Sequence, residues 1–396
     1  MKNYFYPLVE SPYRKKDLLA AKKVIDSGHI TIGNYTSKFE KTFSKKLKTK
    51  YNLMVNSGSS ANLLAFQCLI NPYRKRRLKP GDEVLIPTLC WSTSLWPIIQ
   101  SGLKPKFVEV DLNTLNIDLK QLKKKITKKT KAIMLVHVLG NSTNMQNLMK
   151  LVKKKRLILI EDTCESLGSK YKSKYLGTFG EFSSFSFYSS HQISSGEGGM
   201  ICCKSEEDYE IMKALRSHGW LRGLKNEKKI SNKFKNLDKR FIFYNSGFNL
   251  RPTDVSASIG LSQFQDFEKL KRIRNFNRNL IVNALKRNEK IKKVFTFINE
   301  NKFVKPFWFS IPILIDKSRN RKAIIDKIEK SGIETRPIIS GNFLKQPSII
   351  KYKLNKNEKF INSDIVNNTG FFIGIPNKKL GKTFITKVIS VFEKSI

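Results

Sequence analysis

Short apolar runs that alternate with helical patterns are the feature that most constrains how this chain can fold. The runs are rich in β-branched residues, and they lie at residues 83–87, 105–110, 132–136, 157–161, 183–188 and 200–202. Continuously apolar strands are buried on both faces, and helices between them allow parallel pairing. The pattern predicts an α/β fold in which helices cover both faces of a mostly parallel sheet.

The pattern changes after about residue 255. A long helical stretch runs from Asp254 to about Lys286, and a strand-like segment at 308–315 and a helical segment at 320–331 follow. This order is typical of a smaller α+β domain. For a chain of 396 residues we expect a large domain over residues 1–258 and a small C-terminal domain over residues 259–396.

The large positive charge does not by itself identify a partner. Lysine and arginine number 75 against 32 acidic residues, but the excess is spread along the chain in runs such as Lys123–Lys125 and Lys153–Lys155. Charge runs of this kind are typical of solvated faces. We expect no nucleic-acid partner, and a basic surface also suits a substrate that carries a diphosphate.

The chain shows no signal for a membrane, for export or for a metal. No segment approaches the roughly 18 consecutive apolar residues of a membrane-spanning helix, and the first residues contain no apolar signal-peptide core. The five cysteines form no C-x-x-C pair and no zinc-type spacing with the four histidines. We expect a soluble cytoplasmic protein with reduced cysteines and no metal site.

A small, hydroxyl-rich segment, Asn56–Ser60, follows a strand-like run at 51–55 and leads into an apolar helical pattern. Free backbone N–H groups and the positive end of the helix dipole bind phosphate at such a position. An ordinary helix N-cap explains the same residues. The segment is therefore a candidate phosphate loop that needs support from elsewhere in the chain.

Asp162 ends the apolar run that begins at residue 157. Ligands of open parallel sheets lie beyond the carboxyl ends of the strands, so Asp162 is expected to face the site. An aspartate there can keep a pyridine nitrogen protonated, which makes the ring an electron sink. A helix N-cap is the alternative interpretation.

Residues 183–199 contain a strand, a polar loop with one imidazole, His191, and a glycine turn into another strand. An imidazole titrates near neutral pH and can accept or donate a proton. A single histidine in a loop is more often structural, but its position between a strand and a glycine turn favours a functional role here.

These segments together resemble the DegT/StrS family of sugar aminotransferases, which are fold type I enzymes that use pyridoxal phosphate (PLP). The resemblance extends from Gly28 into the C-terminal domain, and it rests on Ser57–Ser59, Trp91, Glu161–Asp162, Ser186–Phe187, Gly196–Gly199 and Asn249–Pro252. It implies a mixed, mostly parallel sheet sandwiched by helices, with a smaller α+β domain after it.

His191 stands at the position where most members of the family carry the lysine that tethers the cofactor. An imidazole cannot form that bond, so the resemblance implies that PLP, and pyridoxamine phosphate derived from it, bind noncovalently. One branch of the family shares this departure and comprises the 3-dehydratases of nucleotide-linked 4-keto-6-deoxy sugars. Some of these enzymes hold an iron–sulfur cluster on cysteines that here would fall between Arg216 and Lys239, a stretch without cysteine. We therefore expect no iron–sulfur cluster.

Within this branch the chain looks most similar to the enzymes that dehydrate GDP-4-keto-6-deoxy-D-mannose in colitose synthesis for lipopolysaccharide O-antigen. The similar segments are Thr114–Asp118, Ser217–Trp220 and Arg336–Lys345. The resemblance implies a lyase that takes L-glutamate as amino donor and releases a 4-keto-3,6-dideoxy sugar. It also implies a homodimer in which each subunit completes the active site of the other.

The resemblance also implies the roles of individual residues. The catalytic residues would be His191, which moves the proton at the cofactor and assists loss of the hydroxyl at carbon 3, and His218. His137 would support the site from a strand end. The cofactor would be held by Gly58, Ser59 and Ser186 at its phosphate, by Trp91 and Asp162 at its ring, by Glu165 where a Gln or His is usual, and by Asn249 of the second subunit.

Some assignments stay open at the level of sequence. Arg251 and Arg336 could bind the diphosphate or the carboxylate of glutamate, since a guanidinium suits both, but an ordinary ion pair fits each equally well. The nucleotide could be CDP or UDP instead of GDP. Two other functions remain: a PLP-binding regulator that has lost its lysine, and a transaminase that uses another lysine such as Lys204.

Overall fold

The computed structural model describes residues 4–10, 12–354 and 358–396. Its centre is a sheet of seven strands in the order β1-β9-β8-β5-β4-β2-β3, and β9 is antiparallel to both of its neighbours while the other pairs are parallel. The mixed, mostly parallel sheet is therefore confirmed. The strands are β1 (Tyr51–Val55), β2 (Glu83–Pro87), β3 (Lys104–Val108), β4 (Thr130–Val136), β5 (Ile158–Asp162), β8 (Phe182–Ser186) and β9 (Gly199–Cys203).

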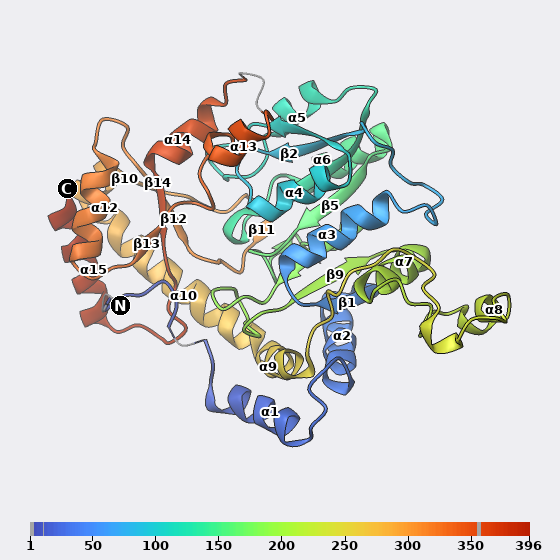
Figure 1. Cartoon of the computed structure of the whole chain (residues 1–396). Coiled ribbons are helices and arrows are strands. Elements are labelled where there is room, and N and C mark those ends of the chain that lie inside the picture. Colours follow the sequence, from blue (N-terminus) through green and yellow to red (C-terminus); the bar gives the residue numbers. More distant parts are fainter. Residues whose placement is uncertain (1–3, 11, 355–357) are drawn as a thin grey trace.

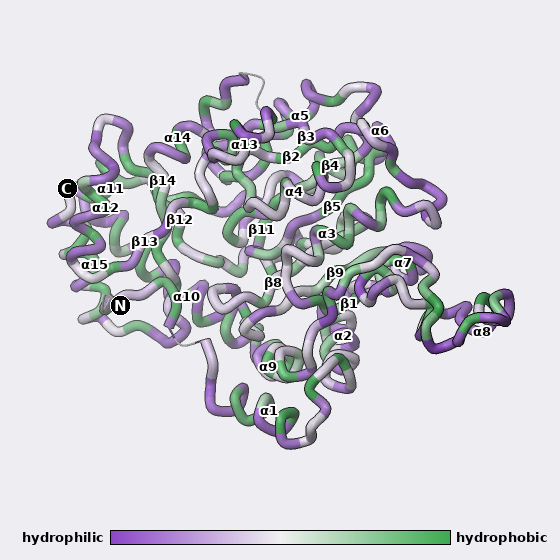
Figure 2. Tube along the Cα trace, viewed as in Figure 1, coloured by the Kyte–Doolittle hydropathy of each residue, from purple (hydrophilic) through white to green (hydrophobic). Residues whose placement is uncertain are grey.

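Helices cover both faces of this sheet (Figure 1). Side chains of successive strand residues point to opposite faces, so Val84 and Ile86 pack with one helical layer and Leu85 with the other. The first layer contains α3 (Gly58–Leu69), α4 (Ser92–Gln100) and α7 (Glu206–Arg216). The second contains α5 (Leu119–Lys125), α6 (Met145–Lys155), α2 (Asn34–Leu47) and α9 (Asp254–Gln265). In Figure 2, hydrophobic residues recur along the strands of the sheet and the helices on its two faces.

The C-terminal part contains a second, antiparallel sheet in the order β10-β12-β14-β13. Its strands are β10 (Phe295–Phe297), β12 (Ile311–Ile315), β13 (Thr335–Arg336) and β14 (Gly370–Ile373). Its apolar core is shared with α10 (Phe267–Lys286), α11 (Glu289–Val294), α12 (Arg321–Lys330) and α15 (Lys382–Ser395). The division of the chain at residues 258 and 259 stays a prediction. Several short elements connect the two parts: α13 (Pro347–Lys351), α14 (Ile361–Thr369), β6 (Lys170–Tyr171), β7 (Lys174–Tyr175) and β11 (Val304–Lys305).

The long helical stretch expected from residue 254 to residue 286 is two helices, α9 and α10, which meet at Asp266. Asp266 leaves the helical conformation with φ −104° and ψ 7°, and its carboxylate accepts a hydrogen bond of 2.6 Å from Arg14 and a second from Lys16. Both partners come from the other end of the chain, so the local sequence does not reveal the break.

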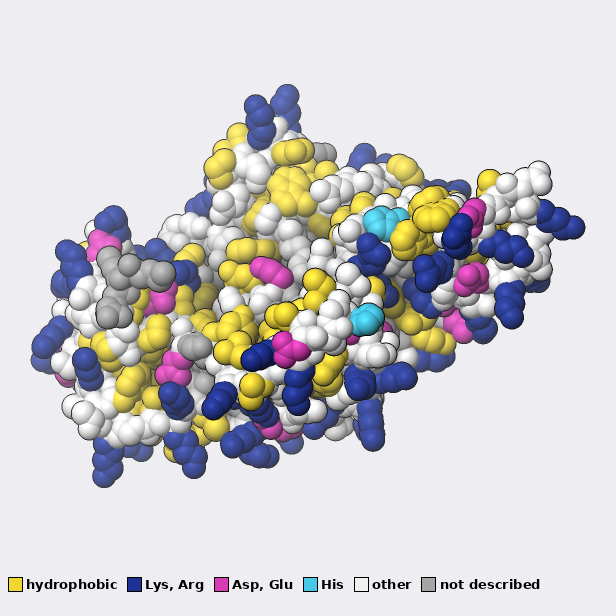
Figure 3. Space-filling view, turned by 60° about the horizontal axis from the view of Figure 1, so that its bottom comes forward, with side chains coloured by type: hydrophobic (Ala, Val, Ile, Leu, Met, Phe, Trp, Pro, Cys, Tyr) yellow, Lys and Arg dark blue, Asp and Glu magenta, His cyan; other side chains and the backbone are white. Residues whose placement is uncertain are grey.

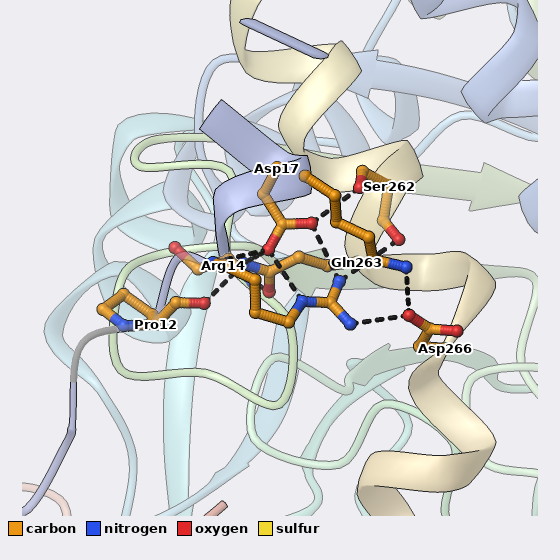
Figure 4. A network of polar contacts seen from close by, with 8 residues as sticks. Pro12, Arg14, Asp17, Ser262, Gln263 and Asp266 are labelled. Carbon is orange, nitrogen blue, oxygen red and sulfur yellow. Dashed lines mark hydrogen bonds and ion pairs between the residues drawn. The ribbon is translucent and has the colours of Figure 1, made fainter. Parts of the chain in front are cut away.

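A strap formed by residues 12–17 joins the N-terminus to α9 (Figure 4). Asp17, in the first turn of α1 (Lys15–Asp26), is fully buried and accepts hydrogen bonds from Arg14 (2.8 Å) and Ser262 (2.6 Å). Before the strap, the Tyr6 hydroxyl donates to the backbone oxygen of Gly374 at 2.6 Å. The N-terminal residues thus tie the small sheet to α9.

Residues 220–244, which include α8 (Glu227–Ser231), form an arm that extends away from the central sheet (Figure 1). The arm exposes several large apolar side chains: Phe234, Leu237, Phe241 and Phe243. Among the residues that the structure describes, no helix has the length and apolar character needed to cross a membrane.

Candidate active site

Part of the predicted site, namely Gly58, Ser59, Asp162, Glu165, Ser186 and His191, comes together at one edge of the central sheet. Through the pairing of Val55 with Gly199, of Gly199 with Ser186, and of Ser184 with Asp162, the carboxyl ends of β1, β8 and β5 lie side by side. The candidate phosphate loop follows β1 and the His191 loop follows β8. Asp162 ends β5, and Glu165 follows in the next turn. This is the edge where ligands of parallel sheets bind.

The candidate phosphate loop begins helix α3 and packs closely against Ser186. Ser57 caps the helix by accepting a hydrogen bond from the N–H of Ser60 at 3.1 Å. A Cβ on Gly58 would lie 2.7 Å from the Cβ of Ser186, so a larger residue does not fit there. The Ser59 hydroxyl lies 2.8 Å from that of Thr93. Backbone N–H groups at a helix N-terminus and two nearby hydroxyls therefore form a cradle suited to a phosphate.

Asp162 is 5% exposed at the end of β5. Its Oδ2 accepts hydrogen bonds from the Ser94 hydroxyl at 2.7 Å and from the Asn62 amide at 2.9 Å, and its Oδ1 accepts one from the N–H of Cys164 at 3.1 Å. These neutral donors orient the carboxylate and leave its charge in place. A buried carboxylate of this kind can pair with a protonated ring nitrogen.

Glu161, the residue before Asp162, points into the opposite layer and is fully buried. Its carboxylate accepts hydrogen bonds from His137 Nε2 at 2.9 Å and from the N–H groups of Gly177 (2.9 Å) and Gly180 (2.7 Å). Burial favours the neutral acid, but these donors outweigh it, so the pKa of Glu161 lies below its ordinary value. The pair of Glu161 and His137 fixes the strand end from below the site.

Glu165 has the opposite electrostatic environment. Burial, opposed by a hydrogen bond from the N–H of Leu139 and aided by the negative charge of Asp162, raises its pKa from 4.5 to about 8. That bond measures 2.9 Å, and Leu139 adopts a left-handed conformation with φ +52° to make it. At neutral pH Glu165 therefore mostly retains its proton and can donate a hydrogen bond, as a Gln or His at this position would.

His191 lies between two aromatic rings. Its imidazole contacts the ring of Phe309 edge-on with centroids 5.2 Å apart, and that of Tyr188 at 6.2 Å. Nδ1 is buried and has no hydrogen-bond partner among the described residues. Burial lowers the pKa of His191 to about 4, although the charge of Asp162 opposes the shift. The ring is therefore neutral at pH 7 and able to accept a proton.

A second cluster, which we call the arm cluster, contains His218, Trp220, Asn249 and Arg251. The rings of His218 and Trp220 are 5.1 Å apart, and the Arg251 guanidinium lies over Trp220 at 5.6 Å. Arg251 Nε donates to Asn249 Oδ1 at 3.0 Å, and the Asn249 side chain is exposed. The cluster is thus preassembled on the surface at the base of the arm.

Trp91, Arg336 and His29 lie at the surface. Trp91 is the N-cap residue of α4 and is 58% exposed, which is unusual for so large an apolar ring. Arg336, on β13, forms an ion pair of 2.8 Å with Glu334, so the ordinary interpretation accounts for its position. His29 is exposed after α1 and its Nδ1 lies 3.1 Å from the backbone oxygen of Ser27.

The sequence did not point to Asn62, Ser94 and Leu139, which contact Asp162 or Glu165. Asn62 and Ser94 lie in apolar helical patterns of α3 and α4, where a single polar residue that is buried is the available signal. Leu139 acts through its backbone N–H, and no side-chain pattern identifies such a donor.

Comparisons with known proteins identify the family. The chain matches the DegT/DnrJ/EryC1/StrS aminotransferase family over residues 12–392. It is 36% identical over 374 residues to a GDP-4-keto-6-deoxy-D-mannose 3-dehydratase of Escherichia coli O55:H7, with 93% of this chain and 95% of that protein covered.

Solved structures of the same enzyme superimpose over almost the whole chain. The E. coli GDP-4-keto-6-deoxy-D-mannose-3-dehydratase with bound hydrated PLP gives a TM-score of 0.91 at 34% identity and covers 99% of this chain and 100% of that chain. A GDP-4-keto-6-deoxymannose-3-dehydratase with a trapped PLP-glutamate geminal diamine gives 0.89 at 34% identity, covering 98% and 99%. The fold expected from the sequence is confirmed.

Proposed function

We propose that this chain, which belongs to the DegT/DnrJ/EryC1/StrS aminotransferase family, does not transaminate its sugar substrate but dehydrates GDP-4-keto-6-deoxy-D-mannose at carbon 3. It uses PLP as cofactor and L-glutamate as amino donor, and the product is the 4-keto-3,6-dideoxy sugar. The observation that carries the proposal is His191, a neutral, half-buried imidazole at the position where the family's tethering lysine is expected. The identity of 36% with a dehydratase of this specificity supports it.

The residues at the sheet edge fit this cofactor. The cradle of Gly58, Ser59 and Ser186 suits its phosphate, since a Cβ at Gly58 would fill the space against Ser186. The Asp162 carboxylate would pair with the ring nitrogen. Trp91 offers an exposed ring for stacking, and the protonated Glu165 would donate to the ring hydroxyl.

The bound cofactor supplies an electron sink through its ring and, after reaction with glutamate, an amine that can join the sugar ketone at carbon 4. Because its pKa is low, the His191 imidazole is unprotonated at neutral pH, and it would accept the proton from the carbon next to the cofactor ring. The imidazolium that results then donates this proton to the hydroxyl that leaves carbon 3. Asp162 stabilises the imidazolium by its negative charge. One imidazole thus serves as base and then as acid.

Water and lysine are kept away from this chemistry by the local structure. Phe309 and Tyr188 contact the His191 ring and limit its solvation. Lys204, the alternative amine, follows the antiparallel strand β9, and its N–H donates to the backbone oxygen of Glu181 at 3.2 Å at the amino-terminal end of β8. It therefore lies at the opposite edge of the sheet from Asp162.

The arm cluster completes the site of a second copy of the chain. Asn249 would bind the cofactor phosphate of the partner, and His218 and Arg251 would contact its substrate; Arg336 remains a weaker candidate for substrate binding. Exposed apolar side chains support a homodimer. Figure 3 shows such side chains gathered in the middle of one face, with Lys and Arg side chains around them. Helix α1 exposes Leu18, Leu19 and Ile25.

Incubation with a panel of nucleotide-linked 4-keto-6-deoxy sugars tests the proposal. Purified protein, PLP and L-glutamate should convert the GDP-mannose derivative to a product in which a hydrogen replaces the hydroxyl at carbon 3, so that it lacks one oxygen atom, and should release 2-oxoglutarate and ammonia. Preference for a CDP or UDP sugar would correct the nucleotide. Absence of any sugar product, with the cofactor spectrum unchanged by glutamate, would instead favour a regulator that binds PLP.

A further inference from the structure

No side chain orients the ring of His191 through Nδ1, and the polar contact that acts on the ring is with the backbone of Tyr188 in the same loop. Catalytic histidines usually donate one ring N–H to a carboxylate or carbonyl, which fixes the ring and its tautomer. Here Nδ1 is buried without a partner among the described residues, and Phe309 and Tyr188 contact the ring by their edges. The direction of the imidazole must therefore be set by the backbone of its loop.

The next residue, Gln192, ties that backbone to two other segments. Its side chain is 1% exposed, and its Nε2 donates to the backbone oxygen of Glu165 and, at 3.2 Å, to that of Phe307. The two hydrogens of one amide thus bind two chain segments that come from different parts of the fold. Neither bond involves the cofactor cradle or the ring of His191.

The two anchor segments are themselves joined to the site. The N–H of Phe309 donates to the backbone oxygen of Leu139 at 3.1 Å, and the N–H of Leu139 donates to Glu165 at 2.9 Å. Since the Phe309 ring contacts His191, the contacts form a closed circuit through Gln192, Glu165, Leu139, Phe309 and His191. A closed circuit of this kind has little freedom to let the imidazole move.

The far end of the His191 loop is held separately. The N–H of Ser194 donates to Gln263 Oε1 at 2.8 Å, and Gln263 Nε2 donates to the backbone oxygen of Pro12 at 2.7 Å (Figure 4). The Tyr13 hydroxyl lies 3.2 Å from that of Ser194. The strap thus fixes the loop at residue 194. At the end that bears His191, the N–H of His191 donates to the Tyr188 oxygen at 3.0 Å within the loop, and the amide of Gln192 ties this end to other segments.

We propose that Gln192 is a positioning residue for the dehydration: its amide holds the His191 loop against the Glu165 and Phe307 backbones and so aims the imidazole at the proton it transfers. This inference rests on the proposed function for its catalytic consequence. Its structural part, the ordering of the loop by Gln192, can be tested without activity.

The first test compares Gln192→Met with the parent. Methionine has a similar length and no N–H donor, so both anchoring bonds are lost with little change in volume. Loss of a residue that positions a catalytic group typically lowers activity about 10- to 100-fold. We expect a fall of this size in kcat, with the KM for the sugar and the affinity for PLP within about twofold of the parent.

Gln67→Met is the matched control. Gln67 Nε2 donates to the Ser101 hydroxyl at 3.1 Å near the end of α3 that lies away from the phosphate loop, so the same substitution is made without touching the site. We expect kcat to stay at the parental value. A Gln192→Met variant that also keeps kcat within about twofold of the parent would overturn the inference.

A double variant separates positioning from a general structural effect. If Gln192 acts through His191, then Gln192→Met should not reduce further the residual rate of His191→Asn, because residues that act as one unit are not additive. The positioning role is wrong if Gln192→Met lowers the residual rate of His191→Asn by the same factor as it lowers the rate of the parent. It is also wrong if the fall in kcat is accompanied by a higher KM for the sugar and a weaker affinity for PLP.

Amide hydrogen exchange tests the ordering of the loop independently of catalysis. In Gln192→Met the amides of residues 188–193 should exchange faster than in the parent, while His191→Asn should leave them protected. Unchanged protection in Gln192→Met would refute the inference. Normal loop ordering by Gln192 in a protein that does not dehydrate any sugar would instead refute the proposed function.

Discussion

Glu165 should make the cofactor-free protein less stable as the pH rises. The folded-state pKa of about 8 lies above the ordinary value of 4.5, mainly because the carboxyl is buried. Between these two values the folded protein binds more protons than the unfolded chain, so the free energy of unfolding decreases with increasing pH. Glu165→Gln removes this titration and keeps the size and the donor capacity of the side chain.

The shift sets the expected magnitude. One pKa unit corresponds to about 1.4 kcal/mol, so the change from 4.5 to about 8 has an upper limit of roughly 5 kcal/mol when Glu165 is fully ionised. The side chain retains partial exposure at the open sheet edge, and solvation of the carboxylate there lowers the effect to about 2–4 kcal/mol.

Urea unfolding of the parent and of Glu165→Gln, at one protein concentration and without cofactor, provides the measurement. The two proteins should have similar stability near pH 5, and the variant should be more stable by about 2–4 kcal/mol near pH 9. Glu83→Gln is the control, because contacts with Thr127 and Lys106 lower the pKa of Glu83 and its loss should destabilise the protein at high pH. A difference between parent and Glu165→Gln that does not change with pH would refute the reasoning.

Further predictions concern His191, Gly58 and the second subunit. His191→Asn should retain noncovalent cofactor binding, seen in the absorbance spectrum, and lose dehydration by about 10²- to 10⁴-fold; near-parental turnover would contradict the role of the imidazole. In the cofactor-free parent, NMR titration should place the pKa of His191 near 4, and because this lies below the ordinary 6.5, the residue should lower stability as the pH falls through that interval. A value above 6.5 would show that burial does not dominate. Gly58→Ala should weaken PLP binding by about tenfold or more, measured by equilibrium titration, since its Cβ would lie 2.7 Å from that of Ser186 and displace the phosphate cradle. If sites are shared between subunits, mixing His191→Asn with Asn249→Ala should form hybrid dimers with one intact site and restore part of the activity that each variant lacks; no recovery in proven hybrids would argue for sites within one chain.

The alternating apolar runs were sufficient to predict the layered fold because burial on both faces leaves a strong pattern in each strand. The position of Asp162 followed from the rule that ligands lie at the carboxyl ends of parallel strands, and His191 was identified from its polar loop and from the family resemblance. The break at Asp266 could not be predicted, since its partners Arg14 and Lys16 are distant in the sequence. Likewise, the partners of Gln192 are backbone oxygens, and such contacts leave no trace in the residue pattern.

The electrostatic properties of the site also depend on tertiary structure. Glu161 and Glu165 are both acidic residues near the same strand end, yet the donors around Glu161 lower its pKa, while burial and the charge of Asp162 raise that of Glu165. No local pattern distinguishes the two. The resemblance supplied the expected position of Glu165, and the folded structure supplies its protonation.

The mass of the sugar product formed by the parent and by His191→Lys tests the central claim most directly. Both proteins would be given PLP, L-glutamate and GDP-4-keto-6-deoxy-D-mannose under the same conditions. The parent should yield the sugar that has lost one oxygen atom and gained no nitrogen, while His191→Lys should lose this product and form some amino sugar. An amino sugar as the main product of the parent would contradict the account, because it would mean that His191 does not separate dehydration from amination.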